Sequence, residues 1–403
     1  MTRLFDKFYE IRIPQWRAVT LVWAICLALV NILGSLIYAI EERDSTHGDW
    51  LVTFSDGYSR RGFSGETVYF ISSALSTHPK WVVVAIQILV ALVFSGIALY
   101  LARMTFGFLP LALMVFFPMG FSYILNDPGI AGRKDFLFLT TALIWLISQS
   151  SKGSSANRQV LRLSGFTLAF FVVFSFHEGF VFFVPLLLVL SSYLSQAKEA
   201  SHKLFQAIPP ALAGGLTLLL NLSASMPSPA EICARAMSAG YSSSVCEGST
   251  LYFQTEPRVA VLENIESYSL GRALPYLLFL GIFVTLMIKF QHRYSNPSLG
   301  SIRLIIGISS TLPIYVLGTD WGRWLSVTIV LLTCSLILSL KISPSELDIA
   351  NSRPLGLRAK ISLLLFSLCW CLGWGVAHHS PVFASAITNF IPAISFIKSV
   401  ISP

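Results

Sequence analysis

The run AVTLVWAICLALVNILGSLIYAI, residues 18–40, decides the fold class of this chain. It contains no charged residue, and about 20 apolar residues suffice to cross the roughly 30 Å of hydrocarbon in a bilayer. The run ends at the charged residues Glu41 and Glu42. A cleavable signal peptide has a shorter apolar core followed by small residues. We therefore interpret residues 18–40 as a retained membrane-spanning helix.

The composition of the whole chain agrees with this interpretation. Of its 403 residues, 54% are hydrophobic and only 12% are charged, and the mean hydropathy is +0.70. Soluble domains carry about 25% charged residues, so this chain cannot coat a soluble surface. The composition excludes a cytosolic enzyme, a disordered protein and a secreted disulfide-rich scaffold. It predicts an all-α, polytopic transmembrane helix bundle, with residues 1–403 as a single integral-membrane domain.

Further apolar runs extend the pattern along the chain. Those long enough to be clear spans are residues 81–102, 106–125, 205–222, 273–288, 324–340 and 361–377. Shorter runs lie at 136–149, 163–176, 179–195 and 304–317. Together with residues 18–40, these runs predict about eleven spans.

The loops between the runs set the orientation, because Lys and Arg are retained on the cytoplasmic side. With a cytoplasmic N-terminus, most Lys and Arg lie on the inner side and most Asp and Glu on the outer side. The net charge of +8 is then the positive-inside signal, and it requires no nucleic-acid partner. We expect the cytoplasmic (inner) membrane, with outer loops at 41–80 and 223–271. Residues 382–401 form either a twelfth span, broken by Pro392, or an interfacial helix.

The only cysteines outside the apolar runs are Cys233 and Cys246, which both belong to the outer loop 223–271. An oxidising exterior permits a disulfide in such a loop, and a bridge between these two residues closes an ordinary loop. We expect a Cys233–Cys246 disulfide, and two free thiols are the alternative.

Four polar clusters interrupt the apolar pattern, and the topology places all four on the outer side. They are residues 54–66 with Asp56, Arg60 and Arg61; 126–135 with Arg133, Lys134 and Asp135; 177–179 with His177 and Glu178; and 318–324 with Asp320 and Arg323. The last two clusters lie at the turns of hairpins whose arms have about 14–17 residues, or about 21–26 Å as helix. Such arms are shorter than the full thickness of the bilayer, so both turns should lie a few ångströms below its outer surface. Charged groups at that depth are tolerated only where they line a water-filled cavity or the protein interior. The sequence therefore predicts an outward-facing polar cavity floored by His177, Glu178, Asp320 and Arg323.

Each cluster also has a purely structural interpretation. Asp56 could lie in a solvated loop, although Gly57, Gly62 and Gly65 would permit tight backbone turns against a ligand. His177 and Glu178 could form a satisfied internal pair, as could Asp320 and Arg323. Arg133 and Lys134 could mark a helix end, and we expect Asp135 to cap the helix that begins at 136. The tryptophans near span boundaries fit an aromatic belt: Trp50, Trp81, Trp321 and Trp324.

A cavity that offers carboxylates and guanidinium groups suits transfer chemistry on a lipid-linked phosphate. Arg and Lys side chains hold phosphate groups. A carboxylate with a raised pKa can act as general base toward an acceptor hydroxyl. The lipid tail of such a donor would lie in the bilayer beside the cavity.

The first outer loop resembles that of the membrane sugar transferases of the GT-C type. Their catalytic acidic residue lies in this loop, and Asp56-Gly57-Tyr58 is similar to the Asp-containing segment, with 67–78 as its interfacial helix. The whole motif set also resembles multi-pass proteins of bacterial exopolysaccharide and O-antigen assembly, including polymerases. The chain departs from many GT-C members, because it has no adjacent acidic pair at this position and no large soluble outer domain. The resemblance implies sugar transfer or polymerisation from a polyprenyl-phosphate-linked donor to a glycan acceptor.

We expect the following roles, with membrane lipids as further partners. Asp56 is the expected general base, and the other catalytic candidates are Glu178, His177 and Asp320. The leaving phosphate gains negative charge in the transition state and needs preorganised cations; the candidates are Arg60, Arg61, Arg133, Lys134 and Arg323. His177 and Glu178 would orient the acceptor or share a divalent cation, if one is used, and no other cofactor is indicated.

Two other classes of function stay open. A transporter or flippase for a lipid-linked glycan or another solute would place ionisable residues in the middle of its helices, or show broken helices in repeats. A non-catalytic membrane partner of a synthesis complex would not need four clusters of mixed charge on one side. We favour transfer at the outer face of the membrane over both.

Overall fold

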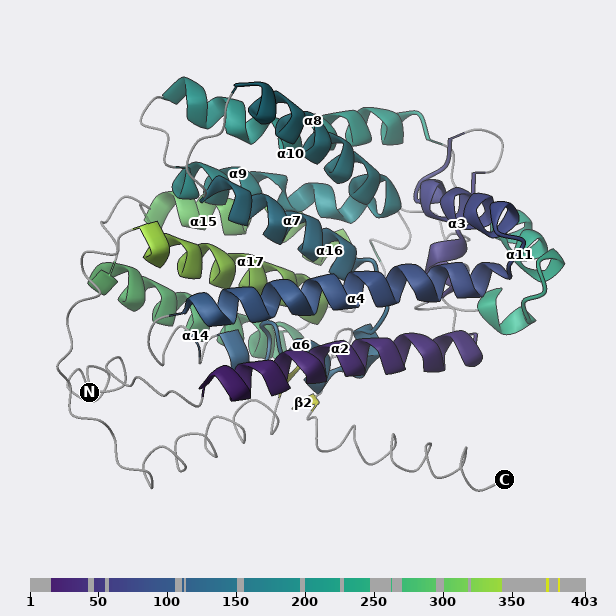
Figure 1. Cartoon of the computed structure of the whole chain (residues 1–403), viewed down its shortest axis with the longest axis horizontal. Coiled ribbons are helices and arrows are strands. Elements are labelled where there is room, and N and C mark those ends of the chain that lie inside the picture. Colours follow the sequence, from purple (N-terminus) through teal and green to yellow (C-terminus); the bar gives the residue numbers. More distant parts are fainter. Residues whose placement is uncertain are drawn as a thin grey trace.

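The computed structural model is predominantly helical, and Figure 1 shows most of its helices running side by side. It describes residues 16–42, 47–54, 58–105, 111, 114–150, 156–195, 200–224, 228–246, 262, 270–294, 301–317, 320–342, 375–376 and 383–384. Its longer helices are α2 (Trp16–Ile40), α4 (Pro79–Met104), α7 (Asp135–Gln149), α8 (Ala156–Phe176), α9 (Val184–Leu194), α10 (Ala200–Leu222), α14 (Leu270–Tyr294) and α17 (Trp321–Ile342). Shorter elements are α6 (Tyr123–Asn126), α15 (Ser301–Ser309), α16 (Leu312–Leu317), the 3₁₀ segments η2 (Pro128–Ile130) and η3 (Glu178–Phe183), and the strand pair β1 (Gly375–Val376) and β2 (Phe383–Ala384). The elements of the two long loops are described below.

Five of the described helices are long and apolar enough to cross a membrane. The qualifying segments are Arg17–Ile40, Pro79–Met104, Gln159–Phe176, Phe205–Leu222 and Trp321–Ser339. The last of these belongs to α17, and 94% of its apolar window is buried inside the protein, so α17 is the central helix of the bundle. The first span, α2, packs along α4 (Figure 1). The chain therefore has the helices of a membrane protein, whereas the count of about eleven spans and their orientation stay predictions.

The two hairpins that carry polar turns each combine one long arm with one short arm. In the first, α8 runs over 21 residues, but the returning arm of η3 and α9 covers only Glu178–Leu194. In the second, the arm before the turn is divided into α15 and α16, and α17 returns over 22 residues. We expected both arms of each hairpin to be short. The expectation was wrong for α8 and α17, because both helices extend beyond the apolar runs 163–176 and 324–340: α8 begins at residue 156, and α17 covers residues 321–342.

The expected span 106–125 is not a continuous helix in its described part. Turns occupy residues 118–122, between helical positions at 114–115 and α6. Pro118 lacks the N–H that a continuing helix needs, and Gly120 is a poor helix former. The expected span 361–377 and the segment 382–401 lie largely outside the described residues, and their described positions form the strand pair β1–β2.

The described parts of the loops 41–80 and 223–271 meet at one end of the molecule, where α2 ends and α4 begins (Figure 1). The first contributes η1 (Gly48–Leu51) and α3 (Gly62–Ala74), and the second contributes α11 (Pro229–Ser238) and η4 (Ser243–Cys246). Buried apolar side chains from both loops form one cluster, which includes Trp50, Val68 and Tyr241. Cys233 and Cys246 form a disulfide, with their Cα atoms 5.5 Å apart, and it joins α11 to η4.

Two glycines let α3 pack closely on the segment that precedes it. A Cβ at Gly65 would overlap the carbonyl of Val52, and a Cβ at Gly62 would overlap the ring of Phe54. The Gly65 amide donates to the Val52 carbonyl at 2.9 Å. We expected these glycines to form turns against a ligand, but both lie inside α3 and accommodate the chain itself.

Replacing Gly65 by Ala should therefore destabilise the protein. The new Cβ forces the backbone of Val52 away from α3, and overpacking of this kind costs about 1–3 kcal/mol. The matched control is Gly96→Ala in α4, where no atom lies within 4 Å of the new Cβ. Thermal unfolding of both purified variants in one detergent measures the effect. An equal or higher midpoint for Gly65→Ala than for Gly96→Ala would contradict the packing described here.

The Cys233–Cys246 disulfide predicts that neither thiol reacts in intact cells. A membrane-impermeant maleimide should label these residues only after treatment with a reductant. Variants with a single cysteine, Cys233→Ser and Cys246→Ser, supply the labelled reference because each leaves one free thiol. Ready labelling of the unreduced wild type at both positions would show that α11 and η4 are not joined by this bond.

Candidate functional site

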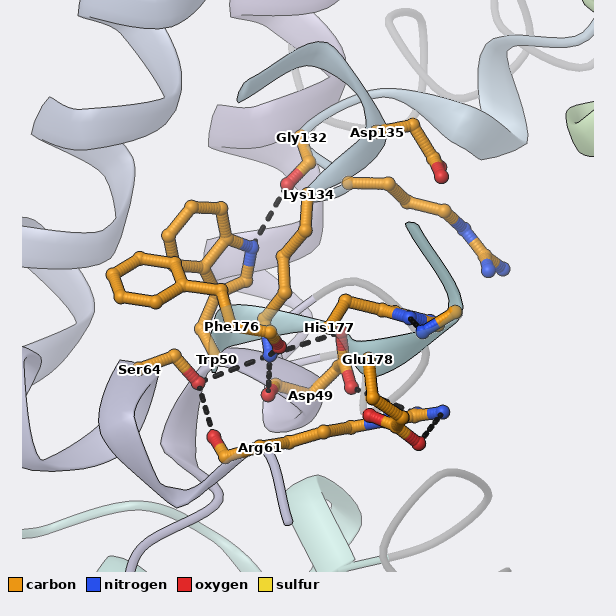
Figure 2. Close-up of polar contacts among 12 residues, drawn as sticks. Asp49, Trp50, Arg61, Ser64, Gly132, Lys134, Asp135, Phe176, His177 and Glu178 are labelled. Carbon is orange, nitrogen blue, oxygen red and sulfur yellow. Dashed lines mark hydrogen bonds and ion pairs between the residues drawn. The ribbon is translucent and has the colours of Figure 1, made fainter. Parts of the chain in front are cut away.

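The centre of the candidate site is the ammonium group of Lys134, which lies directly before α7. Its side chain is fully buried, and its Nζ donates hydrogen bonds to the carbonyl of Asp49 at 2.7 Å, to Ser64 Oγ at 3.0 Å and to the carbonyl of Phe176 at 3.1 Å. The Asp49 carboxylate lies 3.3 Å from the same Nζ. Figure 2 shows the Lys134 side chain entering this set of acceptors. One cation thus joins η1, α3 and the end of α8.

Burial and charge act in opposite directions on this pair. Burial lowers the pKa of Lys134 to about 8, and the Asp49 carboxylate opposes the shift. Burial favours the neutral form of Asp49, but Lys134 and Arg61 outweigh it and hold the pKa of this carboxyl well below its usual range. Both groups are therefore charged at neutral pH. A buried ion pair of this kind is tolerated because additional hydrogen bonds satisfy the ammonium group.

Arg61 connects the 41–80 loop to the turn after α8. Its Nε and Nη2 donate to the Glu178 carboxylate at 2.9 and 3.1 Å, the two-pronged geometry that Arg and a carboxylate favour. Its Nη1 lies 3.6 Å from the Asp49 carboxylate. The backbone of Arg61 is in the left-handed region, with φ of 61°, directly before α3. Such a conformation is uncommon for a residue other than glycine, and here it occurs at a residue that contacts two carboxylates.

A second ionic network surrounds Arg323 in the first turn of α17. Its Nε and Nη2 donate to the Asp135 carboxylate at 2.8 and 2.9 Å, and its Nη1 donates to Asp320. Asp320 also lies 3.5 Å from the Nη1 of Arg133. We expected Asp135 to cap the helix that follows it. The carboxylate instead pairs with Arg323, and α7 begins at Asp135 itself without a side-chain cap.

His177 lies between the two networks. Its Nδ1 accepts a hydrogen bond from the Gly179 amide at 3.2 Å, and its ring packs edge-on against Trp324 at a centroid distance of 5.6 Å. Burial lowers the pKa of His177 to about 3, and Arg61 adds to the shift. The imidazole is therefore neutral at physiological pH and cannot serve as a fixed positive charge.

The structure brings candidate residues from all four polar clusters into these two networks. They are Arg61, Arg133, Lys134, His177, Glu178, Asp320 and Arg323. Asp56, the expected general base, lies outside the described residues. Arg60 is half-buried, and its Nε is covered without a hydrogen-bond partner among the described residues. Arg61, Arg133, Lys134 and Arg323 each form an ion pair with a carboxylate. Among the described residues, Arg60 is the expected phosphate ligand that forms no such pair.

Of the two carboxylates that organise the site, sequence reasoning missed Asp49 and assigned Asp135 only a helix-capping role. Asp49 lies in the expected outer loop, but no pattern in the sequence distinguishes it from a solvated charge. Its neighbour Trp50 carried a usable signal, although we assigned it to an aromatic belt. Trp50 is only 2% exposed, and its Nε1 donates to the Gly132 carbonyl at 3.0 Å.

The belt assignment was also wrong for Trp321 and Trp324, which are buried beside the site, whereas Trp81 is 47% exposed. A cavity of about 20 Å³ borders Arg323 and Asp135. That volume has room for about one water molecule and is too small for a sugar.

No group of three or more His, Cys, Asp or Glu side chains could hold a metal ion in the part of the chain that the structure describes. His177 contributes its Nδ1 to the Gly179 amide, and Glu178 faces Arg61. The described side chains therefore offer no further ligands for a divalent cation shared by His177 and Glu178.

Removing the Lys134 charge should destabilise the protein strongly. Lys134→Met leaves the Asp49 carboxylate without its closest cation, and breaking a buried pair in this way costs about 3–5 kcal/mol. Asp49→Asn leaves the ammonium group with its three other acceptors and should cost less. The double variant should recover part of the loss of Lys134→Met, because no buried charge is then left alone. Thermal midpoints of the three variants measure this coupling, and strictly additive losses would contradict it.

Known proteins were compared with this chain at the level of family, sequence and structure. No family model, no curated protein and no solved structure matches the chain. Function must therefore be inferred from the residues of the chain and from their geometry.

Proposed function

We propose that this protein transfers or polymerises sugars from a polyprenyl-phosphate-linked donor at the outer face of the cytoplasmic membrane. One observation carries the proposal. Charged residues from four separate segments converge at one site of a chain with membrane-spanning helices, and this site remains partly open to solvent. Arg61 and Glu178 are 19% and 28% exposed, and Asp320 is 26% exposed. A substrate can therefore reach carboxylates and guanidinium groups together.

Arg60 is the best-supported ligand for the donor phosphate. The other cations of the site are already neutralised: Arg61 by Glu178, Lys134 by Asp49 and Arg323 by Asp135 and Asp320. Arg60 follows the Asp56 segment directly and is adjacent to Arg61. A guanidinium group binds phosphate oxygens in a two-pronged geometry. We assign Arg60 the phosphate contact and assign Arg61, Lys134 and Arg323 to holding the site in place.

Asp56 remains the proposed general base toward the acceptor hydroxyl. Glu178, at 28%, is the most exposed carboxylate of the two networks, and we assign it an assisting role. Arg61 binds one edge of Glu178, which leaves part of this carboxylate exposed. Neutral His177 can exchange a hydrogen bond with an acceptor hydroxyl without adding charge. These residues would orient the acceptor while Arg60 stabilises the negative charge that develops on the leaving phosphate.

Exposed apolar side chains near α3 support a donor with a lipid tail. Phe70 of α3 and Leu75 directly after this helix are 75% and 67% exposed, and Trp81 at the start of α4 is 47% exposed. Aromatic and apolar side chains in this setting are typical of the boundary between bilayer and water. A polyprenyl chain lying in the bilayer beside α3 would bring its phosphate near the N-terminal end of this helix, where Arg60 and Arg61 lie.

Replacing Asp56 by Asn should abolish product formation while the protein stays folded, because the variant keeps the size of the side chain and removes its basicity. Arg60→Ala should lower the rate about 10²–10³-fold, as expected for the loss of one preorganised transition-state contact. Arg60→Lys keeps the charge without the fork and should impair less. The measurement is glycan or glycolipid output in a deletion strain, with each variant at matched abundance in the membrane.

The control for Arg60→Ala is Arg103→Ala. Arg103 is an exposed arginine in the last turn of α4, at the end of that helix away from α3. Its output should equal that of the wild type. Wild-type output from Asp56→Asn would exclude Asp56 as the base and direct attention to Glu178 and Asp320. Full output from Asp56→Asn, Glu178→Gln and Asp320→Asn alike would exclude sugar transfer and favour a transport or partner role.

A further inference from the structure

A second concave surface lies at the C-terminal end of α3, whereas Arg61 of the candidate site lies at its N-terminal end. It is an open groove of about 520 Å³ between the C-terminal half of α3, the start of α4 and the end of α11. Its lining includes Tyr69, Ser73, Ser76, His78, Arg235 and Ser238. Sites for small organic ligands have volumes of about 300–1,000 Å³, so this groove has room for a ligand of several rings.

The groove is rich in hydroxyl groups and carries no uncompensated charge among its lining side chains. Half of its lining residues are serine or threonine. The Ser72 and Ser238 hydroxyls donate to the carbonyls of Thr77 and Arg235, and their oxygens can still accept a hydrogen bond from a ligand. Its arginine, Arg235, donates to both oxygens of the Glu66 carboxylate, at 2.6 and 3.2 Å. The same guanidinium lies 4.4 Å from the centre of the Tyr69 ring. A phosphate or another anion would have to compete with Glu66, whereas a neutral polyol would not.

The walls of the groove are held in place independently of any ligand. Tyr241 contacts both histidines at this end: its hydroxyl lies 3.1 Å from His47 Nε2, and its ring lies 4.8 Å from the ring of His78. The Cys233–Cys246 disulfide joins the two elements that flank Tyr241. A groove whose walls are already fixed binds a flexible chain at a smaller entropic cost than a groove whose walls must first become ordered.

We propose that this groove binds a neutral saccharide, and that it holds the part of the glycan acceptor that lies away from the reacting end. The role as an acceptor subsite rests on the proposed function. Arg61 lies directly before α3, and Tyr69 lies eight residues further along, inside this helix. Eight residues correspond to about 12 Å along a helix. A glycan chain seated in the groove could thus extend along α3 to Glu178 and Arg60.

The test measures saccharide binding separately from transfer. The probe is the neutral oligosaccharide fraction released by mild acid from the surface polysaccharide of the organism that carries this chain, labelled with a fluorophore at the reducing end. Fluorescence polarisation follows its binding to the full-length protein in phosphatidylcholine nanodiscs, with no lipid-linked donor present. Inorganic phosphate serves as an anionic competitor.

Two adjacent positions of α11 provide matched variants. Ser238→Trp places a large ring in the groove and should weaken probe binding by at least about tenfold. Met237→Trp introduces the same ring at a position that is 51% exposed and does not line the groove, and it should bind like the wild type. Ser73→Ala removes one hydroxyl from an exposed position of α3 and should weaken binding about two- to tenfold. Phosphate should not displace the probe.

The outcomes separate this inference from the proposed function. Arg60→Ala should lose product formation but bind the probe like the wild type, because Arg60 does not line the groove. Saturable binding that is lost in Ser238→Trp would support the saccharide site even if every carboxylate variant forms product normally. Absence of saturable binding, equal binding by Ser238→Trp and Met237→Trp, or displacement of the probe by phosphate would overturn the inference.

Discussion

The need to satisfy one buried ammonium group is the constraint on which the candidate site depends. Lys134 reaches three acceptors and a carboxylate that come from η1, α3 and the end of α8. A shift of any of these segments away from Lys134 would leave its buried ammonium group without a hydrogen-bond acceptor. Desolvation makes such an error costly, so the ion pair fixes the relative positions of the elements that carry Arg60, Arg61 and Glu178.

This constraint divides the charged residues into two groups. Lys134, Arg323 and Asp135 are almost fully enclosed. Lys134 pairs with Asp49, and Arg323 pairs with Asp135, so these charges hold the helices in their arrangement. Residues nearer the solvent, such as Glu178, keep part of their surface open. The site thereby combines a rigid charged floor with a few groups that can respond to a substrate, as preorganised electrostatic stabilisation requires.

The sequence predicted the long apolar helices well and the interior of the site poorly. Residues 18–40 and 81–102 appear in α2 and α4 nearly as expected, because length and apolarity are local properties. The break in 106–125 was missed because hydropathy averages over Pro118 and Gly120. The partnership of Lys134 with Asp49 joins residues 85 positions apart, and that of Arg323 with Asp135 joins residues 188 apart. Local spacing contains no information about such pairs, although the clustering of charges between apolar runs did indicate where they gather.

The contact between the loops 41–80 and 223–271 has a consequence for the order of assembly. Glu66 receives its partner Arg235 from a segment 169 residues further along the chain, and His47 receives Tyr241 from 194 residues further. At synthesis rates of about 5–20 residues per second, the 41–80 loop waits roughly 8–40 s for these partners. During this interval the nascent chain exposes an incomplete groove wall and an unmatched Glu66. Early insertion of α2 and α4 and late closure by α11 are therefore distinct stages in the biogenesis of this protein.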